Sequence, residues 1–152
     1  RVAVMIGGVI AQVGTPDEVY STPNSRAVAE VIGSPPMNFF TGRISEDGTA
    51  FVGDILQEPV PISAGTRKGE PATLGIRPED FWLADGPAGT GVELRVSSIE
   101  PLGGYTIVNA LVGKQIVKVR ALGQVALAPG QALRTTIDKR RVHVFDVSGQ
   151  RI

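Results

Sequence analysis

The sequence of 152 residues contains no cysteine, so disulfide bonds and thiolate metal sites are excluded. Its 15 basic residues balance 15 acidic ones, and a chain without net charge has no overall field that favours nucleic acid or an anionic membrane. No apolar run approaches the roughly 20 residues that a membrane-spanning helix needs. No secretory signal peptide opens the chain. These absences are those expected of a cytosolic protein.

Histidine and aromatic residues are also scarce. The one histidine, His143, has no recognisable partners, and a metal site needs several ligands, so we expect a strand residue that lies partly on the surface. The basic run 139–141 could bind phosphate, but it is more typical of a solvated loop. Barrels that bind single strands combine stacking aromatics with a basic groove. Most aromatics here have apolar neighbours, which favours a role in the core: Phe39, Phe40, Phe51, Phe81, Trp82 and Tyr105.

Glycine and proline are abundant by contrast, with 19 and 11 residues. Such frequent breaks favour short strands joined by turns over long helices. The apolar runs 2–6 and 9–13 flank Gly7-Gly8, which predicts a tight hairpin. Both strands of this hairpin are apolar on both faces, as buried strands are.

Two short helices are predicted after the hairpin. The segment TPDE at 15–18 combines a threonine N-cap, a proline in the first turn and a capping-box glutamate. Pro23 ends this helix. A second helix is expected over roughly 25–32, with a serine N-cap and Gly33 at its C-terminal end.

From Asn38 onward the pattern indicates β-strands. Glycine or proline lies in nearly every gap, and residues 92–96 alternate between apolar and polar, as in a half-buried antiparallel sheet. Many short strands predict a mainly β fold of one or two small barrels. The halves 38–84 and 92–152 are similar in length and style, without a residue-level repeat. The expected strands are 39–44, 50–55, 60–62, 73–76, 81–84, 92–99, 105–112, 115–121, 133–137 and 142–147.

The segment Ser34-Pro35-Pro36 cannot be helical and is poorly suited to a strand interior. We therefore place a domain boundary there. The expected linker residues are Ser34, Pro35, Pro36 and Asn38, and the expected domains are 1–33 and 34–152.

Four phrases carry a family resemblance: RVAVMIGG at 1–8, QVGTPDEVY at 12–20, GSPPMN at 33–38 and LGIRPED at 74–80. In this order and spacing they resemble the C-terminal part of a carbohydrate-uptake ABC importer ATPase of the maltose or glycerol-3-phosphate type. The resemblance covers nearly the whole chain. One small departure is Val9, where many relatives have a polar residue.

This resemblance implies that 34–152 form a transport-associated region of OB-fold-like antiparallel barrels. It implies that 1–33 are the last hairpin and helices of a nucleotide-binding domain whose catalytic half is missing from this chain. The implied role is a non-catalytic regulatory and dimerisation domain. The alternative is a module that senses a small ligand, an oxyanion or a sugar phosphate. A nucleic-acid-binding OB module is disfavoured by the balanced charge and the few aromatics.

The resemblance also implies the setting of the chain. The parent ATPases bind ATP and magnesium and act at the inner face of a prokaryotic cell membrane. For this chain we expect no cofactor and no nucleic acid. The expected partners are a second copy of the chain, importer membrane subunits reached through the ATPase domain, and a regulatory protein.

An ATP-hydrolysing chain needs a glycine-rich loop ending in Gly-Lys-Ser/Thr and a Walker-B carboxylate. The one candidate pair is Gly113-Lys114. Gln115 follows it, Val108 stands where the loop needs glycine, and strand residues follow where a helix must begin. We therefore expect this chain neither to bind nor to hydrolyse ATP.

The candidate site residues are Gly75, Arg77, Pro78 and Glu79 of the LGIRPED segment. Pro78 favours extended geometry at Arg77, and Glu79 can pair with the guanidinium. We favour structural support of the barrel over ligand binding, and we expect no catalytic or metal-binding residue.

The hairpin at 2–13 is expected to need a partner. Burying an aliphatic side chain is worth roughly 1.5–3 kcal/mol, and an isolated hairpin is marginal. We therefore expect it to pack against another copy of the chain, which gives a homodimer or a larger assembly.

Overall fold

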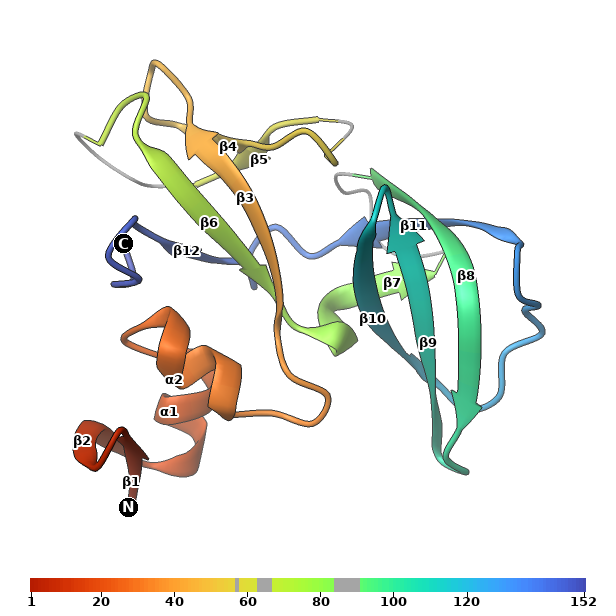
Figure 1. The fold of residues 1–152 in the computed structure, drawn as a ribbon, viewed down its shortest axis with the longest axis horizontal. Helices are drawn as coiled ribbons and strands as arrows, with labels where there is room; N and C mark the ends of the chain where they lie inside the picture. The colour runs from red at the N-terminus through yellow and green to blue at the C-terminus, as the bar shows by residue number, and fades with distance from the viewer. Residues whose placement is uncertain (57, 63–66, 84–90) are drawn as a thin grey trace.

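Figure 1 shows the fold of the computed structural model, which describes residues 1–56, 58–62, 67–83 and 91–152. A hairpin and two short helices at the N-terminus lie beside two curled antiparallel sheets. The predicted mainly β, OB-like fold is confirmed. Among the helices in these ranges, none is long and apolar enough to cross a membrane.

The N-terminal elements form as predicted. Strand β1 (Val2–Ile6) pairs with β2 (Val9–Gly14) across the turn Gly7-Gly8. Helix α1 (Pro16–Ser21) and helix α2 (Arg26–Val31) follow.

Side-chain caps explain where the two helices begin. The Thr15 hydroxyl accepts the backbone N–H of Glu18 at 3.2 Å, and the Glu18 carboxylate accepts the backbone N–H of Thr15 at 2.7 Å. This is the predicted capping box. The Ser25 hydroxyl accepts the backbone N–H of Val28 at 3.3 Å. These bonds satisfy donors that a helix start leaves free.

Only one face of the hairpin is covered by the described chain. Val4 packs against Val19 of α1 and Val28 of α2 in a small apolar cluster. In a single copy the other face is exposed, because two short helices can cover only one side of the hairpin. The exposed large side chains are Val2, Met5, Val9, Ile10 and Val13.

The remaining strands form two five-stranded sheets in which all pairs are antiparallel. The first sheet has the order β12-β6-β3-β4-β5, and the second has the order β10-β9-β8-β11-β7. The first contains β3 (Asn38–Ile44), β4 (Ala50–Val52), β5 (Val60–Pro61), β6 (Pro71–Ile76) and β12 (His143–Phe145). The second contains β7 (Phe81–Leu83), β8 (Gly91–Pro101), β9 (Tyr105–Val112), β10 (Gln115–Leu122) and β11 (Ala132–Ile137).

Every predicted strand is present, although several ends differ. The strand predicted at 50–55 stops at Val52, and the strand predicted at 142–147 shortens to His143–Phe145. The last residue of the strand predicted at 81–84 lies outside the described residues.

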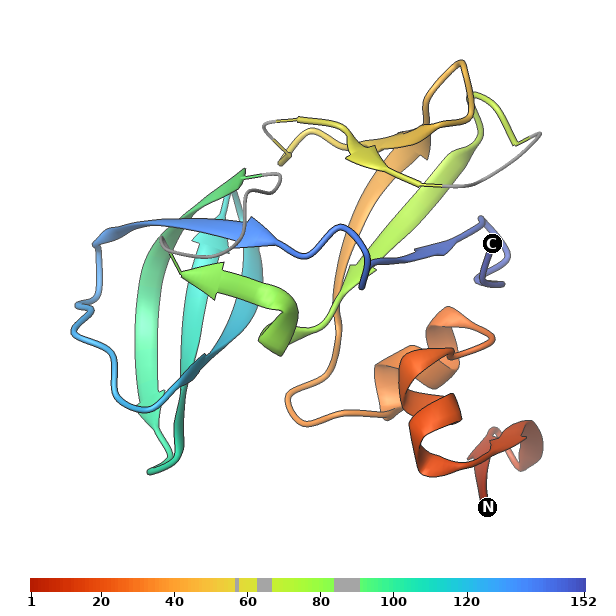
Figure 2. The same cartoon turned by 180° about the vertical axis from the view of Figure 1, so that it is seen from behind.

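The sequence halves 38–84 and 92–152 do not correspond to the two sheets, because the chain interleaves the sheets (Figures 1 and 2). Strand β7 joins the second sheet by pairing with β11, while β12 returns to the first sheet and pairs with β6. Sheet membership depends on hydrogen bonds between distant segments, and the local pattern of apolar residues does not record these partners.

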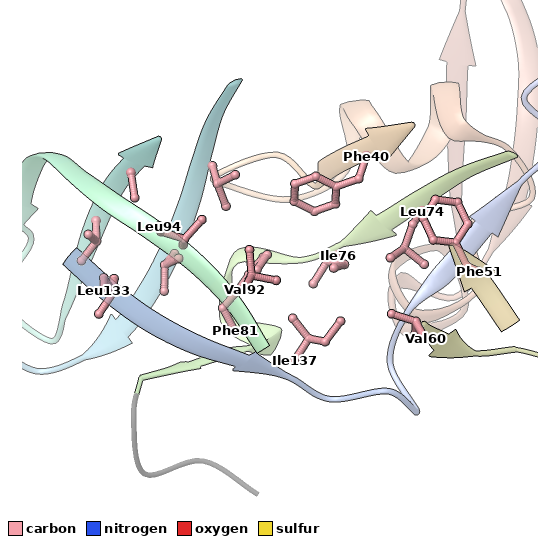
Figure 3. Close-up of a cluster of buried hydrophobic side chains, with 14 of the residues drawn as sticks. Phe40, Phe51, Val60, Leu74, Ile76, Phe81, Val92, Leu94, Leu133 and Ile137 are labelled. Atoms are coloured by element: carbon pink, nitrogen blue, oxygen red, sulfur yellow. The ribbon is translucent and has the colours of Figure 1, made fainter. Parts of the chain in front are cut away.

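One apolar core joins both sheets (Figure 3). Phe40 of β3 and Phe81 of β7 meet edge to face with ring centroids 6.4 Å apart. The predicted core role of the aromatics is confirmed for these two and for Phe51, but Trp82 is 45% exposed on the edge strand β7. Figure 3 follows the core through Phe51, Val60, Leu74, Ile76, Val92, Leu94, Leu133 and Ile137.

Asn38 also joins the two sheets. Its side-chain amide donates to the carbonyls of Ile76 at 3.3 Å and Lys118 at 2.9 Å, and its oxygen accepts the Lys118 backbone N–H at 2.8 Å. Asn38 was expected in the linker but is the first residue of β3 and is buried. Where β3 lies beside β10, these bonds from the Asn38 side chain take the place of backbone pairing between the two strands.

Replacing Asn38 by alanine is expected to lower the free energy of unfolding by about 1–3 kcal/mol, because backbone groups at the junction lose their partner. Asn109→Ala is the matched control, since that amide bonds only to Ser98 and Glu100 on the surface, and we expect a change within about 0.5 kcal/mol. Urea denaturation measures both. Equal losses in the two variants would contradict a bridging role for Asn38.

Candidate functional site

The LGIRPED segment leaves the first sheet and turns into the second. Strand β6 ends at Ile76, Arg77 is extended, and a single 3-10 turn, η1 (Pro78–Asp80), leads into β7. The η1 turn starts with Pro78, whose missing backbone N–H would have no partner within the turn. Apart from half-buried Glu79, residues 74–80 are all buried.

Gly75 allows a close approach at the end of β6. A Cβ atom there would lie 2.5 Å from the sulfur of Met37 and 3.0 Å from a ring carbon of Phe145. Both residues are buried with Ala29 of α2 in a second apolar cluster. The absence of a side chain at position 75 therefore lets α2 pack against the first sheet.

Arg77 is the largest fully buried side chain among the described residues, with 2% exposure. Its guanidinium donates to the carbonyl of Ile32 at 2.9 Å and to the carbonyl of Tyr20 at 2.5 Å. Ile32 is the C-cap of α2, and Tyr20 lies in the last turn of α1. One side chain therefore connects the ends of both helices to the β-sheets.

This contact has an electrostatic cause. The last carbonyls of a helix have no partner within the helix, and the C-terminal end of its dipole favours a cation. Neither α1 nor α2 has a basic residue in its last turn. Arg77 supplies the missing positive charge from a distant segment. Burial lowers the pKa of Arg77 to about 10, so the group remains protonated at neutral pH.

Tyr20 is held on two sides by the same segment. The Arg77 guanidinium lies 3.6 Å from the centre of the Tyr20 ring, in cation–π geometry. The Tyr20 hydroxyl donates to the Glu79 carboxylate. The expected pair between Arg77 and Glu79 is therefore wrong, because helix carbonyls occupy the guanidinium and the tyrosine hydroxyl occupies the carboxylate.

Gly33 completes the surroundings of Arg77. Its φ of +120° lies in the region that L side chains rarely adopt, and a Cβ atom would lie 3.0 Å from Arg77 Nη1. The expected linker Ser34-Pro35-Pro36 follows, with a cis Ser34-Pro35 peptide bond.

The basic run 139–141 has two roles. Arg140 forms a two-bond ion pair with Asp138, at 3.0 Å for both contacts, and its side chain is 85% exposed. This part matches the expected solvated loop. Arg141 instead pairs with the buried Asp80 at 2.9 Å. Burial raises the pKa of Asp80 to about 6, against the opposing effect of Arg141.

His143 is buried, with 6% exposure, so the expected partly surface position is wrong. It pairs with Gly75 in the register between β12 and β6, and its ring stacks on Phe145. Burial lowers the pKa of His143 to about 4, helped by the charges of Arg151, Arg77 and Arg141. The imidazole is therefore neutral at physiological pH. Within the described ranges, no group of three or more His, Cys, Asp or Glu side chains is placed to hold a metal ion.

These groups surround a cavity of about 180 Å³, which we call the arginine cleft. Sequence reasoning missed Tyr20 and Arg151 as parts of it. Tyr20 is the last residue of the QVGTPDEVY phrase, and the occurrence of that phrase together with LGIRPED was the sequence signal that could have linked Tyr20 to Arg77. No sequence pattern indicates Arg151. The cleft is lined by Tyr20, Ser21, Arg77, Asp80, Arg140, Arg141, Val142, His143 and Arg151.

Two protein-family models match the chain. Residues 33–81 match the MalK OB fold domain, and residues 74–145 match the TOBE domain. The chain carries both of these domains. Their overlap, 74–81, contains all four candidate residues: Gly75, Arg77, Pro78 and Glu79. The predicted resemblance to the C-terminal region of a carbohydrate-uptake ABC importer ATPase is confirmed.

Curated relatives agree with this assignment. The sn-glycerol-3-phosphate import ATP-binding proteins UgpC of Shigella boydii serotype 4 (strain Sb227) and Escherichia coli (strain K12) are each 41% identical over 155 residues. These alignments cover 100% of this chain and 43% of each relative. The sulfoquinovosyl glycerol transport ATP-binding protein SmoE of Agrobacterium fabrum (strain C58 / ATCC 33970) is 36% identical, over 99% of this chain and 43% of that protein. The chain thus spans less than half of these relatives.

A solved structure shares the fold. The cytoplasmic molybdate-binding protein ModG, with molybdate bound, matches with a TM-score of 0.57 at 14% identity. The match covers 70% of this chain and 94% of that chain. At this identity the likeness concerns the fold alone.

Arg77→Ala is expected to lower the free energy of unfolding by about 3 kcal/mol, since each hydrogen bond to a charged group is worth about 1.5–3 kcal/mol. Arg43→Ala, at an exposed arginine of β3, is the control, and we expect a change within about 0.5 kcal/mol. Chemical denaturation followed by circular dichroism measures both. An Arg77→Ala protein as stable as the control would contradict the role of Arg77 in holding the helix ends.

The buried His143 predicts a pH dependence of stability. Its folded pKa of about 4 lies below its ordinary value of 6.5, so the unfolded chain binds more protons between these values. The contribution of His143 is therefore complete above pH 6.5 and is lost as the pH falls toward 4.

Urea denaturation of the wild type and of His143→Gln across this range isolates the effect. Asp80 acts in the opposite direction, because its raised pKa makes stability fall as the pH rises from 3.8 to about 6. Both proteins carry Asp80, so the difference between their curves reports His143. Parallel curves would contradict the depressed pKa.

Proposed function

We propose that this chain is the non-catalytic regulatory and dimerisation region of the ATP-binding subunit of an importer for sugars or related solutes. The observation that carries this proposal is the match of the whole chain to import ATP-binding proteins of which it spans 43%. In this proposal, residues 1–33 belong to the nucleotide-binding domain and residues 34–152 form the regulatory domain.

The geometry at Gly113-Lys114 supports a non-catalytic role. These residues form the two-residue turn between β9 and β10, where Val112 pairs with Gln115. A phosphate-binding loop instead connects a strand to a helix and presents its backbone amides to the phosphates. We propose that ATP and magnesium belong to the rest of the parent protein and that this chain holds no cofactor.

The proposed setting follows from the relatives. The parent subunit works in the cytoplasm, at the inner face of the membrane, and reaches the membrane subunits of the importer through its ATPase domain. A second copy of the chain and a regulatory protein are further proposed partners, and nucleic acid is not.

The exposed face of the hairpin supports self-association. Met5 and Ile10 are 61% and 63% exposed, and they are direct partners in the register between β1 and β2, so they lie on the same face. Burial of such side chains is worth roughly 1.5–3 kcal/mol each. A second copy of the same hairpin provides a complementary apolar face of equal size.

A dimer is therefore expected in sedimentation velocity experiments on the purified chain. Ile10→Glu is expected to raise its dissociation constant by about tenfold or more, because that face loses at least one buried aliphatic group. Val147→Glu is the control, since Val147 is 81% exposed in the loop after β12. A monomer at every concentration, or equal effects of the two variants, would contradict this part of the proposal. The same preparation is expected to leave ATP unhydrolysed.

A second candidate function is the sensing of a small oxyanion or a sugar phosphate. The observation that favours it is the arginine cleft, where several guanidinium groups face a small cavity beside one buried carboxylate.

A further inference from the structure

The arginine cleft lies where three segments meet. Tyr20 and Ser21 come from the end of α1, Arg77 and Asp80 come from the turn after β6, and the third wall comes from the segment that contains β12. Figure 1 shows β12 at the edge of the first sheet, on the side of that sheet where the helices lie. A ligand in this cleft would therefore contact the helices and the sheets together.

The charges around the cleft are mostly positive. Arg140 is neutralised by its own pair with Asp138. Arg141 pairs with Asp80, the one carboxylate in the lining, so Arg77 and Arg151 are the two lining arginines left without a carboxylate partner in the described ranges. Arg77 bonds only to helix carbonyls, and the Arg151 guanidinium has no ion-pair partner within the described ranges.

Two buried nitrogen atoms of the lining residues have no hydrogen-bond partner among the described residues. They are Nε of Arg77 and Nδ1 of His143. The two side chains are 2% and 6% exposed, so their polar atoms cannot rely on bulk water. A buried polar atom without a partner is costly, and native proteins usually supply a water or an ion at such a place.

The size of the cleft limits its ligand. About 180 Å³ corresponds to about six water molecules at roughly 30 Å³ each. Pockets for larger organic ligands usually have about 300–1,000 Å³. The cavity therefore suits an ion with several acceptor oxygens and little further bulk. Guanidinium groups bind such oxygens with paired, charge-assisted hydrogen bonds.

We propose that the arginine cleft binds a small tetrahedral oxyanion, phosphate or sulfate, through Arg77, Arg141, His143 and Arg151. This inference rests on the second candidate function and assigns it a place and a ligand class. The anion accepts hydrogen bonds from the guanidinium groups, and neutral His143 adds an uncharged donor. Because the lining comes from α1, from the turn after β6 and from the segment that contains β12, the bound ion strengthens the connection that Arg77 makes between the helices and the sheets.

Titration calorimetry and thermal unfolding of the whole chain test this proposal. Inorganic phosphate or sulfate at millimolar concentration is expected to release or absorb heat and to raise the Tm, with chloride at equal ionic strength as the reference. A ligand that binds only the folded state raises the Tm in this way. Arg151→Gln is expected to weaken the affinity by about tenfold, because it removes an exposed guanidinium whose charge assists binding.

The matched control is Arg43→Gln, at an exposed arginine that does not line the cleft, and we expect it to bind as the wild type does. His143→Phe retains an aromatic ring but removes Nδ1, and we expect it also to weaken binding. Arg151 is exposed and its side chain holds no other group in the described chain, so Arg151→Gln tests binding in a folded protein.

If Arg151→Gln and His143→Phe leave phosphate binding unchanged, the arginine cleft is not the binding site, and the second candidate function still stands. No binding of phosphate or sulfate beyond the chloride reference would overturn both. A third probe, sn-glycerol 3-phosphate, separates a free ion from a phosphate ester. Tighter binding of the ester than of inorganic phosphate would overturn the assignment to a free oxyanion.

Discussion

The buried guanidinium of Arg77 is the interaction on which the arrangement of this protein depends. It satisfies carbonyls at the ends of both short helices while its backbone lies between β6 and η1, in the segment that links the two sheets. A buried charge is costly unless it is paired and hydrogen-bonded. Here helix dipoles and the face of Tyr20 take the place of a carboxylate. The planar fork of arginine reaches two acceptors at once, which a lysine ammonium does with less directionality.

The surroundings of Arg77 explain why the contact between the N-terminal helices and the sheets has a defined geometry. Gly33 leaves space for the guanidinium, and Gly75 leaves the space that Met37 and Phe145 occupy beside β6. The two sheets share an apolar core, which is strong but not directional. The helices add a small apolar contact and a set of hydrogen bonds at fixed angles. The orientation of the N-terminal elements therefore depends on directional bonds more than on buried area.

The same charges determine the character of the cleft beside this contact. Guanidinium groups gather where one carboxylate, Asp80, is buried, and burial together with the charges of Arg151, Arg77 and Arg141 keeps His143 neutral. The matched MalK OB and TOBE domains overlap at this segment, so the contact between helices and sheets lies where the two domain patterns meet. A ligand or partner that acts on these residues acts on the connection between the N-terminal elements and the barrel.

The sequence by itself determined the local features of this protein. The capping box at 15–18, the turn at Gly7-Gly8 and the alternation at 92–96 depend on neighbours within a few residues, so their patterns identify them. Only the tertiary structure decided that β12 returns to the first sheet and that Arg77 bonds to helix ends 45 and 57 residues away. His143 became buried for the same reason. Such contacts depend on which distant segments pair, and residue spacing along the chain does not encode that choice in a local pattern.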